Sequence, residues 1–279
     1  MDPERYVVIT GASSGIGEAF ALYLAHLGFG VFAGVRKKED AQALRARGAG
    51  RIESLFVDVT DADSVASAAE TVRRAVGESR LAGLVNNAGI AVAAPLEFLP
   101  VEELRRQLEI NVVGQVAVTQ AFLPHLREGN GRVVNVGSIG GKIAGPLLGA
   151  YAASKFAMEG LTDSLRRELE PWAIHVAIVE PGAVRTPIWE RSLMAADALL
   201  HQFPRRALVL YGSEIERQRS SALKAARKGI LPEIAAQAVA HALTAKRPKT
   251  RYPVGRDARV ASVLVRLLPD RVLDRIAGL

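Results

Sequence analysis

The sequence lacks cysteine altogether over its 279 residues. This absence excludes disulfides, thiolate nucleophiles and cysteine-ligated metals, and it favours a reducing, cytoplasmic compartment. No run of about 18 apolar residues occurs, so the sequence predicts no membrane-spanning helix. We also expect no secretory signal, because the stretch YVVIT from Tyr6 already has the character of a buried strand. The expectation is therefore an ordinary globular protein.

The charged residues do not indicate a nucleic-acid partner. The formal net charge is +7, but the basic residues are spread along the chain and are densest after residue 205. No aromatic residues are interleaved with them, and no nucleic-acid-binding motif is present. The five histidines show no spacing typical of metal ligands, so we predict no metal site.

Short apolar runs alternate with helical patterns along most of the chain. The expected strands are 5–10, 30–35, 52–59, 81–89, 131–138 and 174–182, and the helices between them are 15–28, 38–48, 61–77, 101–127 and 150–170. This alternation implies right-handed βαβ crossovers, and continuous apolar strands are typical of a parallel sheet covered on both faces. We predict an α/β fold: one Rossmann-type, doubly wound parallel sheet in a single domain, 1–279.

The last third of the chain breaks the alternation. Residues 188–230 are rich in Leu, Ala and Arg and predict inserted helices that form a substrate lid. RYPVG (251–255) predicts an edge strand, and 257–279 a helical extension. Its helix, 257–268, places an apolar set on one face: Val260, Val263, Leu264, Leu267 and Leu268. Packing of this helix on its own domain is favoured over binding to an anionic membrane surface.

A glycine-rich turn follows the first strand. TGASSGIG (10–17) places Gly11, Gly15 and Gly17 at spacings of four and two, unlike the common G-x-G-x-x-G fingerprint. Glycines let the backbone approach a pyrophosphate, and the helix that opens here offers unpaired N–H groups and the positive end of its dipole. The turn predicts a dinucleotide site; a plain tight turn is the alternative.

The end of the second strand bears on which dinucleotide is bound. NAD sites place Asp or Glu there to accept from the ribose 2′-hydroxyl, but here the position is Val35. Arg36 and Lys37 follow, and a guanidinium suits a 2′-phosphate. Ser13 adds a hydroxyl donor. NADP is therefore favoured over NAD, unless Arg36 and Lys37 merely form a solvated loop.

Tyr151 and Lys155 stand four residues apart in GAYAASKFAMEG (149–160). On a helix this spacing puts both side chains on one face. A free tyrosine has a pKa of about 10, which is high for proton exchange at neutral pH, and a nearby cation lowers it. The pair predicts a general acid/base, with an ordinary polar helix face as the alternative.

Several motifs in order resemble the short-chain dehydrogenase/reductase family from about residue 5 to 190. They are TGASSGIG, NNAG (86–89), Asn111, Ser138, YAASK (151–155) and PGAVRT (181–186). GFGVFAGVRK and RYPVG further resemble the branch of steroid and retinol dehydrogenases. The resemblance implies Tyr151 as general acid/base, Lys155 holding the nicotinamide ribose, Ser138 donating to the substrate oxygen, and Asn111 holding a water that links the lysine to solvent.

The resemblance also implies the cofactor contacts. Asp58 would meet the adenine amine, Asn86 and the backbone of the next three residues the adenosine side, and Val184 and Thr186 the carboxamide. The expected cofactor-binding residues are Gly11, Ser13, Ser14, Gly15, Ile16, Gly17, Arg36, Lys37, Asp58, Val59, Asn87, Ala88, Gly89, Tyr151, Lys155, Pro181, Gly182, Val184 and Thr186.

Two apolar segments predict a pocket for a hydrophobic alcohol or ketone. They contribute Ile143, Pro146, Leu147 and Leu148, and then Trp189, Leu193, Met194, Leu199, Leu200 and Phe203. Packing among the inserted helices is the alternative for these residues. The family resemblance implies a homodimer or homotetramer through helices 101–127 and 150–170.

The leading functional hypothesis is an NADP-dependent oxidoreductase. The alternatives are an NAD-dependent dehydrogenase of the same family, a non-catalytic dinucleotide sensor, and an enzyme that epimerises or dehydrates a nucleotide-sugar. Because Ser138, Tyr151 and Lys155 are all present, an enzyme is favoured over a sensor.

Overall fold

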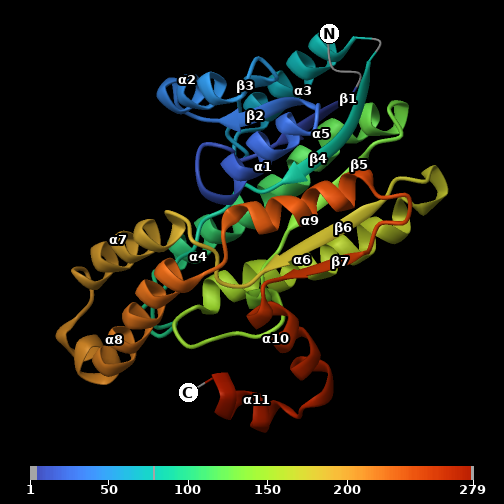
Figure 1. Ribbon diagram of the computed structural model, residues 1–279. Helices are drawn as coiled ribbons and strands as arrows, with labels where there is room; N and C mark the ends of the chain where they lie inside the picture. Colours follow the sequence, from blue (N-terminus) through green and yellow to red (C-terminus); the bar gives the residue numbers. More distant parts are fainter. Residues whose placement is uncertain (1–4, 78, 278–279) are drawn as a thin grey trace.

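The computed structural model describes residues 5–77 and 79–277 (Figure 1). In this part of the chain, seven parallel strands form one sheet in the order β3-β2-β1-β4-β5-β6-β7. The strands are β1 (Arg5–Ile9), β2 (Gly30–Val35), β3 (Ile52–Phe56), β4 (Arg80–Asn86), β5 (Arg132–Val136), β6 (Val176–Pro181) and β7 (Arg251–Val254). The order reverses between β1 and β4, which is where ligands bind in such sheets. The predicted α/β fold is confirmed.

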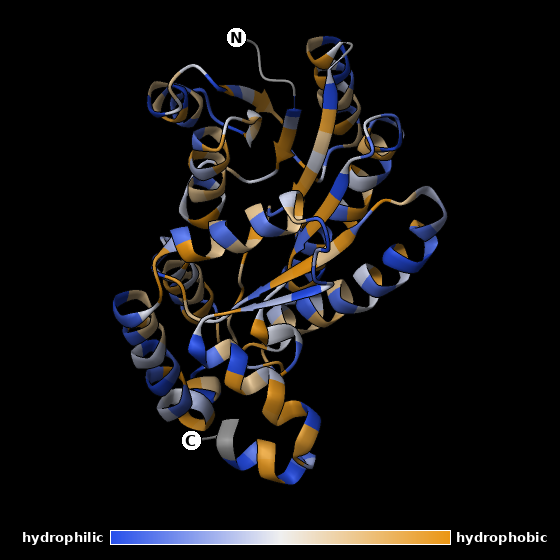
Figure 2. Cartoon of the chain, turned by 45° about the vertical axis from the view of Figure 1, so that its right-hand side comes forward, coloured by the Kyte–Doolittle hydropathy of each residue, from blue (hydrophilic) through white to orange (hydrophobic). Residues whose placement is uncertain are grey.

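Helices cover both faces of the sheet (Figure 1). On one face α1 (Gly15–His26) packs beside α9 (Pro232–Thr244), with Phe20, Leu24 and Leu243 in the core. On the other face α3 (Ala62–Val76) and α5 (Gly114–Glu128) contribute to a second core, which contains Phe122 and Leu126. Figure 2 shows the strands mostly orange and the covering helices mixed, as expected for strands buried on both faces.

Two helices extend these layers. α2 (Lys38–Arg47) follows β2, and α6 (Gly149–Glu168) follows the loop after β5 and ends in a short 3-10 turn, η3 (Glu170–Trp172). The sequence analysis predicted no helix over α9. Its sequence, PEIAAQAVAHALT, has alanine on nearly every side and so shows no clear apolar stripe, although the alanines at 235 and 236 are fully buried.

The expected long helix at 101–127 has a break in its regularity. α4 (Val101–Leu108) passes into a π-helical turn, η1 (Glu109–Val113), before α5 begins. Asn111 lies in this turn and is fully buried. π turns insert one extra residue per turn and are frequent at functional sites.

The segment 188–230 holds α7 (Ile188–Leu200) and α8 (Arg205–Lys228), which stand as a pair beside α4 (Figure 1). These helices are thinly packed: α7 contributes one buried residue, Leu199, and α8 contributes one, Ala207. Few buried apolar contacts give a segment low local stability.

The chain continues through α10 (Arg256–Leu267) and α11 (Asp270–Ala277), which project from the end of β7 (Figure 1). We expected the apolar face of α10 to pack on the domain, and that expectation is wrong for three residues. Val260, Val263 and Leu267 are 57%, 54% and 72% exposed. The helix is held mainly at its first turn, where Ala258 is buried and the Asp257 carboxylate accepts from the backbone N–H of residue 183. Within the described residues, none of the helices is long and apolar enough to cross a membrane.

Candidate active site

A pocket of about 440 Å³ opens at the carboxyl ends of the central strands. Most of the expected site residues line it: Gly11, Ser14, Gly15, Ile16, Arg36, Asp58, Val59, Asn87, Ala88, Gly89, Ser138, Tyr151, Lys155, Pro181, Gly182, Val184 and Thr186. The others, Ser13, Gly17, Lys37 and Asn111, lie off its wall. One cavity therefore brings together the glycine-rich turn, the Tyr–Lys pair and the PGAVRT segment.

The glycine-rich turn forms a close-fitting cradle. Gly11 has a φ of +63°, and a Cβ there would lie 2.8 Å from the Cα of Ala88. A Cβ on Gly17 would lie 2.3 Å from the Gly11 carbonyl oxygen. The Asn87 amide donates to the carbonyl oxygens of residues 10 and 11 at 2.9 Å each. The backbone is thus held where a side chain would fill the space, which suits the approach of a diphosphate.

The N-terminus of α1 faces this cradle without a side-chain cap. Ser14 is the N-cap residue, yet its hydroxyl makes no capping hydrogen bond. The first N–H groups of a helix have no partner within the helix, so they can donate to an anion. The residues present therefore fit a dinucleotide diphosphate at this point.

The second strand ends at the part of the pocket wall that includes Asp58. Arg36 points a guanidinium there, 3.7 Å from Asp58, with 71% of its side chain exposed. Hydrogen bonds from the Thr60 backbone and hydroxyl are the main cause of the low pKa of Asp58, and Arg36 adds to it. Val35 is buried and offers no acceptor. Lys37 is exposed at the start of α2, so of the two basic residues only Arg36 lines the pocket.

Ser138 and Tyr151 place two hydroxyls side by side. Ser138 follows β5 and opens the 3-10 turn η2 (Ile139–Gly141), where its Oγ accepts from the Gly140 N–H at 3.0 Å. Tyr151 lies in the first turn of α6, and a Cβ on Gly140 would lie 3.1 Å from its ring. Burial raises the pKa of Tyr151, while a hydrogen bond to Ser138 acts in the opposite direction.

Lys155 is buried one helical turn beyond Tyr151. Its Nζ donates to the Val136 carbonyl oxygen at 2.8 Å and lies 5.8 Å from the centre of the Tyr151 ring. Burial lowers the pKa of Lys155 to about 8. The expectation that this cation lowers the tyrosine pKa is not met in the chain alone, because desolvation of the phenolate outweighs the hydrogen bond that opposes it.

Asn111 lies against α6 on the side of Ser154. Its side chain accepts from the Ile90 N–H and donates to the Ile90 carbonyl oxygen, both at 2.9 Å, and it also donates to the Ser154 hydroxyl at 3.1 Å. Ser154 in turn donates to the Tyr151 carbonyl oxygen at 2.7 Å. Asn111 therefore joins the loop after β4 to the first turn of α6.

Asn86, which we expected at the adenosine of the cofactor, does not line the pocket. It is fully buried, and its amide donates to Thr119 and Asn135 at 2.8 and 2.9 Å. It links β4 to β5 and α5 inside the core, whereas Asn87, which follows it, lines the pocket.

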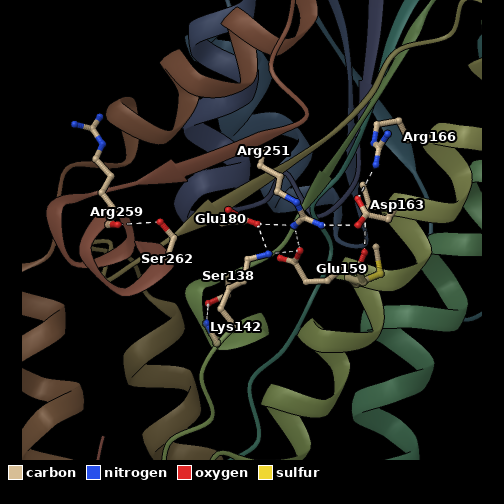
Figure 3. A network of polar contacts seen from close by, with 12 residues as sticks. Ser138, Lys142, Glu159, Asp163, Arg166, Glu180, Arg251, Arg259 and Ser262 are labelled. Carbon is tan, nitrogen blue, oxygen red and sulfur yellow. Dashed lines mark hydrogen bonds and ion pairs between the residues drawn. The ribbon is translucent and has the colours of Figure 1, made fainter. Parts of the chain in front are cut away.

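A cluster of buried charges includes Lys142, four residues after Ser138 (Figure 3). Glu159 and Glu180 are only 8% and 2% exposed. The Lys142 ammonium forms ion pairs with Glu159 at 2.6 Å and with Glu180 at 3.0 Å. The Arg251 guanidinium also pairs with both carboxylates, and its distance to Glu180 is 2.9 Å. Arg251 also reaches Asp163 at 2.8 Å. The cluster ties β7, β6, α6 and the segment after Ser138 together; the sequence analysis missed it because its members are far apart in the chain.

The remaining wall of the pocket is apolar. Ile143, Leu148, Ile188 and Trp189 line it, and the Trp189 indole N–H donates to the Val184 carbonyl oxygen at 2.7 Å. The other expected specificity residues lie elsewhere. Leu199 and Phe203 pack with Val92 in a small separate core, and Met194 is 66% exposed. The pocket wall does not include Pro146, Leu147, Leu193 or Leu200. Arg191 and Ser192 of α7, which the sequence analysis did not single out, line the pocket as well.

Comparison with known proteins agrees with this geometry. The profile of the short chain dehydrogenase family matches residues 5–196. An NADPH-dependent 3-dehydrocapnine reductase of Ornithobacterium rhinotracheale is 37% identical, with 98% of this chain and 95% of the relative aligned. Retinol dehydrogenase 5 of Mus musculus is 38% identical over 98% of this chain and 87% of its own. A short chain dehydrogenase from Burkholderia cenocepacia, solved in complex with NADP, has a TM-score of 0.76 and 26% identity over 99% and 98% of the two chains.

Proposed function

Because this chain belongs to the short-chain dehydrogenase/reductase family, we propose that it transfers a hydride between NADP(H) and a hydrophobic alcohol or ketone, with Tyr151 as general acid/base. The observation that carries the proposal is the single pocket in which Ser138 and Tyr151 face the glycine cradle and Arg36. The family membership and the steroid and retinol dehydrogenase branch expected from the motifs are both confirmed by these matches.

Each residue of the proposed site has a separate role in the reaction. When bound, the nicotinamide supplies or accepts the hydride. Tyr151 passes a proton between its phenol and the substrate oxygen, and Ser138 donates a hydrogen bond to that oxygen as charge develops on it. Lys155 places a cation next to the phenol and toward the nicotinamide ribose. Asn111 holds the first turn of α6, and so the phenol, against the loop after β4.

We assign NADP in preference to NAD from Arg36 and the missing acceptor at Val35. The names of the O. rhinotracheale relative and the B. cenocepacia complex support the assignment. Arg36→Gln should lower kcat/KM with NADPH by about tenfold and leave kcat/KM with NADH unchanged, because a charged hydrogen bond to the 2′-phosphate is lost at an exposed site.

The measurement is the ratio of kcat/KM values for the two cofactors, with Lys37→Gln as the matched control. Lys37 lies off the pocket wall and should change the ratio much less. An equal loss with both cofactors in Arg36→Gln would count against this assignment.

The apolar wall made by Ile143, Leu148, Ile188 and Trp189 supports a hydrophobic substrate. The direct experiment follows the absorbance of the reduced nicotinamide across a panel of sterols, retinoids, long-chain ketones and small sugars, with both cofactors. We expect turnover with apolar alcohols or ketones only. Turnover restricted to sugars would reject the apolar pocket, and binding of NADP without turnover of any compound would favour a sensor.

We further assign a homodimer or homotetramer in the cytoplasm. Apolar side chains on the two long helices are exposed in the single chain, with Val101 at 53%, Val113 at 50% and Phe156 at 46%. Such faces support a partner subunit over α4–α5 and α6. The absence of cysteine supports a reducing compartment. A monomeric mass by light scattering at micromolar concentration would contradict the oligomer.

A further inference from the structure

Arg191 joins the lid to the phosphate cradle. It lies in the first turns of α7, and its guanidinium donates to the Ser14 hydroxyl at 2.9 Å. The two residues are 177 positions apart in the chain, and both line the pocket together with Gly11 and Gly15. This contact places a cation from the lid at the N-terminus of α1.

The hydroxyl that Arg191 engages is the one that leaves α1 uncapped. A serine at the N-cap normally accepts from the second or third N–H of its helix and stabilises it. Ser14 makes no such bond, and its oxygen accepts from Arg191 instead. The guanidinium of Arg191 therefore lies at the N-terminus of α1, where the helix N–H groups receive no hydrogen bond from the Ser14 side chain.

The start of α7 is held in place by three contacts around this point. A Cβ on Gly15 would lie 3.2 Å from the Thr186 side chain, so the PGAVRT segment touches the cradle directly. The Ser192 hydroxyl donates to the Ala91 carbonyl oxygen at 3.0 Å, and the Trp189 indole donates to Val184. Arg191 is thus presented to the cradle by a fixed piece of backbone.

The charge of Arg191 is uncommitted in the part of the chain that the structure describes. Its side chain bonds to the neutral Ser14 and to no carboxylate there, unlike Arg36, which lies near Asp58. A guanidinium has five N–H donors and pairs with phosphate oxygens through two parallel hydrogen bonds. An anion at the cradle would give Arg191 the partner it lacks.

We propose that Arg191 is a cofactor-binding residue that grips the diphosphate of the dinucleotide and thereby fixes the α7–α8 lid over the pocket. The proposal rests on the proposed function, since it assigns a role toward the same cofactor. Because α7 and α8 bury few residues of their own, a charged contact at the start of α7 shifts their position on the domain substantially. The cofactor then binds before the substrate. Its binding positions α7, and this completes the apolar pocket wall that includes Trp189.

The first test is the affinity for NADP⁺, measured from tryptophan fluorescence and by calorimetry in wild type, Arg191→Gln, Arg191→Lys and Arg206→Gln. Arg191→Gln should raise Kd about tenfold, and Arg191→Lys should raise it less because the charge remains. Arg206 lies on α8 outside the pocket lining, so Arg206→Gln should bind like wild type. Adenosine 2′-phosphate, which has no diphosphate, should bind wild type and Arg191→Gln equally.

The second test follows tryptic cleavage of the Arg- and Lys-rich α8 with and without saturating NADP⁺. In wild type the cofactor should slow cleavage several-fold, and in Arg191→Gln it should not. If cleavage of Arg191→Gln is faster without cofactor but is still slowed by it as in wild type, Arg191 is only a structural tether and the proposal fails. It fails as well if Arg191→Gln has the wild-type Kd. Failure of the wild type itself to bind NADP⁺ would instead overturn the proposed function.

Discussion

Tyr151→Phe should lower kcat by about 10²- to 10⁴-fold while the Kd for NADP⁺ stays close to that of wild type. The substitution removes one hydroxyl and leaves the ring, so the contact with Gly140 and the first turn of α6 are kept. The hydroxyl is next to that of Ser138, and a hydrogen bond between the two acts to lower the pKa of Tyr151. Without it the hydride step must proceed with the substrate oxygen unprotonated.

The matched control is Tyr211→Phe. This variant also removes a phenolic hydroxyl, one that donates to Glu97 at 2.9 Å on the exposed side of α8, away from the pocket lining. Its kcat should be unchanged. Steady-state rates and cofactor affinity are measured on the same preparations, so that loss of binding is separated from loss of chemistry. If Tyr151→Phe keeps more than a tenth of the wild-type kcat, the phenol is not the general acid/base.

The parts of the fold that could be predicted from the sequence are the elements whose residue pattern lies within one continuous stretch of the chain. Strands such as β1 and β2 are nearly continuous apolar runs, which is the pattern expected for strands buried on both faces. The sequence did not predict α9, because its own alanines are distributed around the helix and leave no clear apolar stripe. The apolar stripe of α10 was predicted, but amphipathicity does not say what covers it, and Val260, Val263 and Leu267 remain exposed.

The features of the site also fall into two groups, those that a local pattern predicts and those that depend on tertiary contacts. The Tyr151–Lys155 spacing and the glycine turn are local patterns, and both line the same pocket in the structure. The lysine's bond to Val136 and the direction of the tyrosine pKa depend on burial, which no local pattern records. Arg191 meets Ser14, and Arg251 meets Glu180, only because the chain returns to the same sheet edge over long distances.

Arg251→Met should lower the free energy of unfolding by about 3–5 kcal/mol. The substitution removes one of two cations shared by Glu159 and Glu180 and also leaves Asp163 without one of its two arginines (Figure 3). Glu180 is 2% exposed, so its carboxylate cannot exchange the lost partner for water. The measurement is urea unfolding at pH 7, with Arg105→Met as the control. Arg105 pairs with Glu102 at 3.2 Å on an exposed face, and its loss should cost less than about 1 kcal/mol.

The effect of Arg251→Met should also depend on pH, and the sign follows from the carboxylates. Burial already raises the pKa of Glu159, and removing a cation raises it further above the value in the unfolded chain. A group whose pKa is higher when folded binds protons in the folded state, so the variant recovers stability as pH falls toward 5. The difference in unfolding free energy between wild type and Arg251→Met should therefore be smaller at pH 5 than at pH 7. A difference that is constant or grows on acidification would mean that lost packing of the arginine stem, not unpaired carboxylate charge, causes the destabilisation.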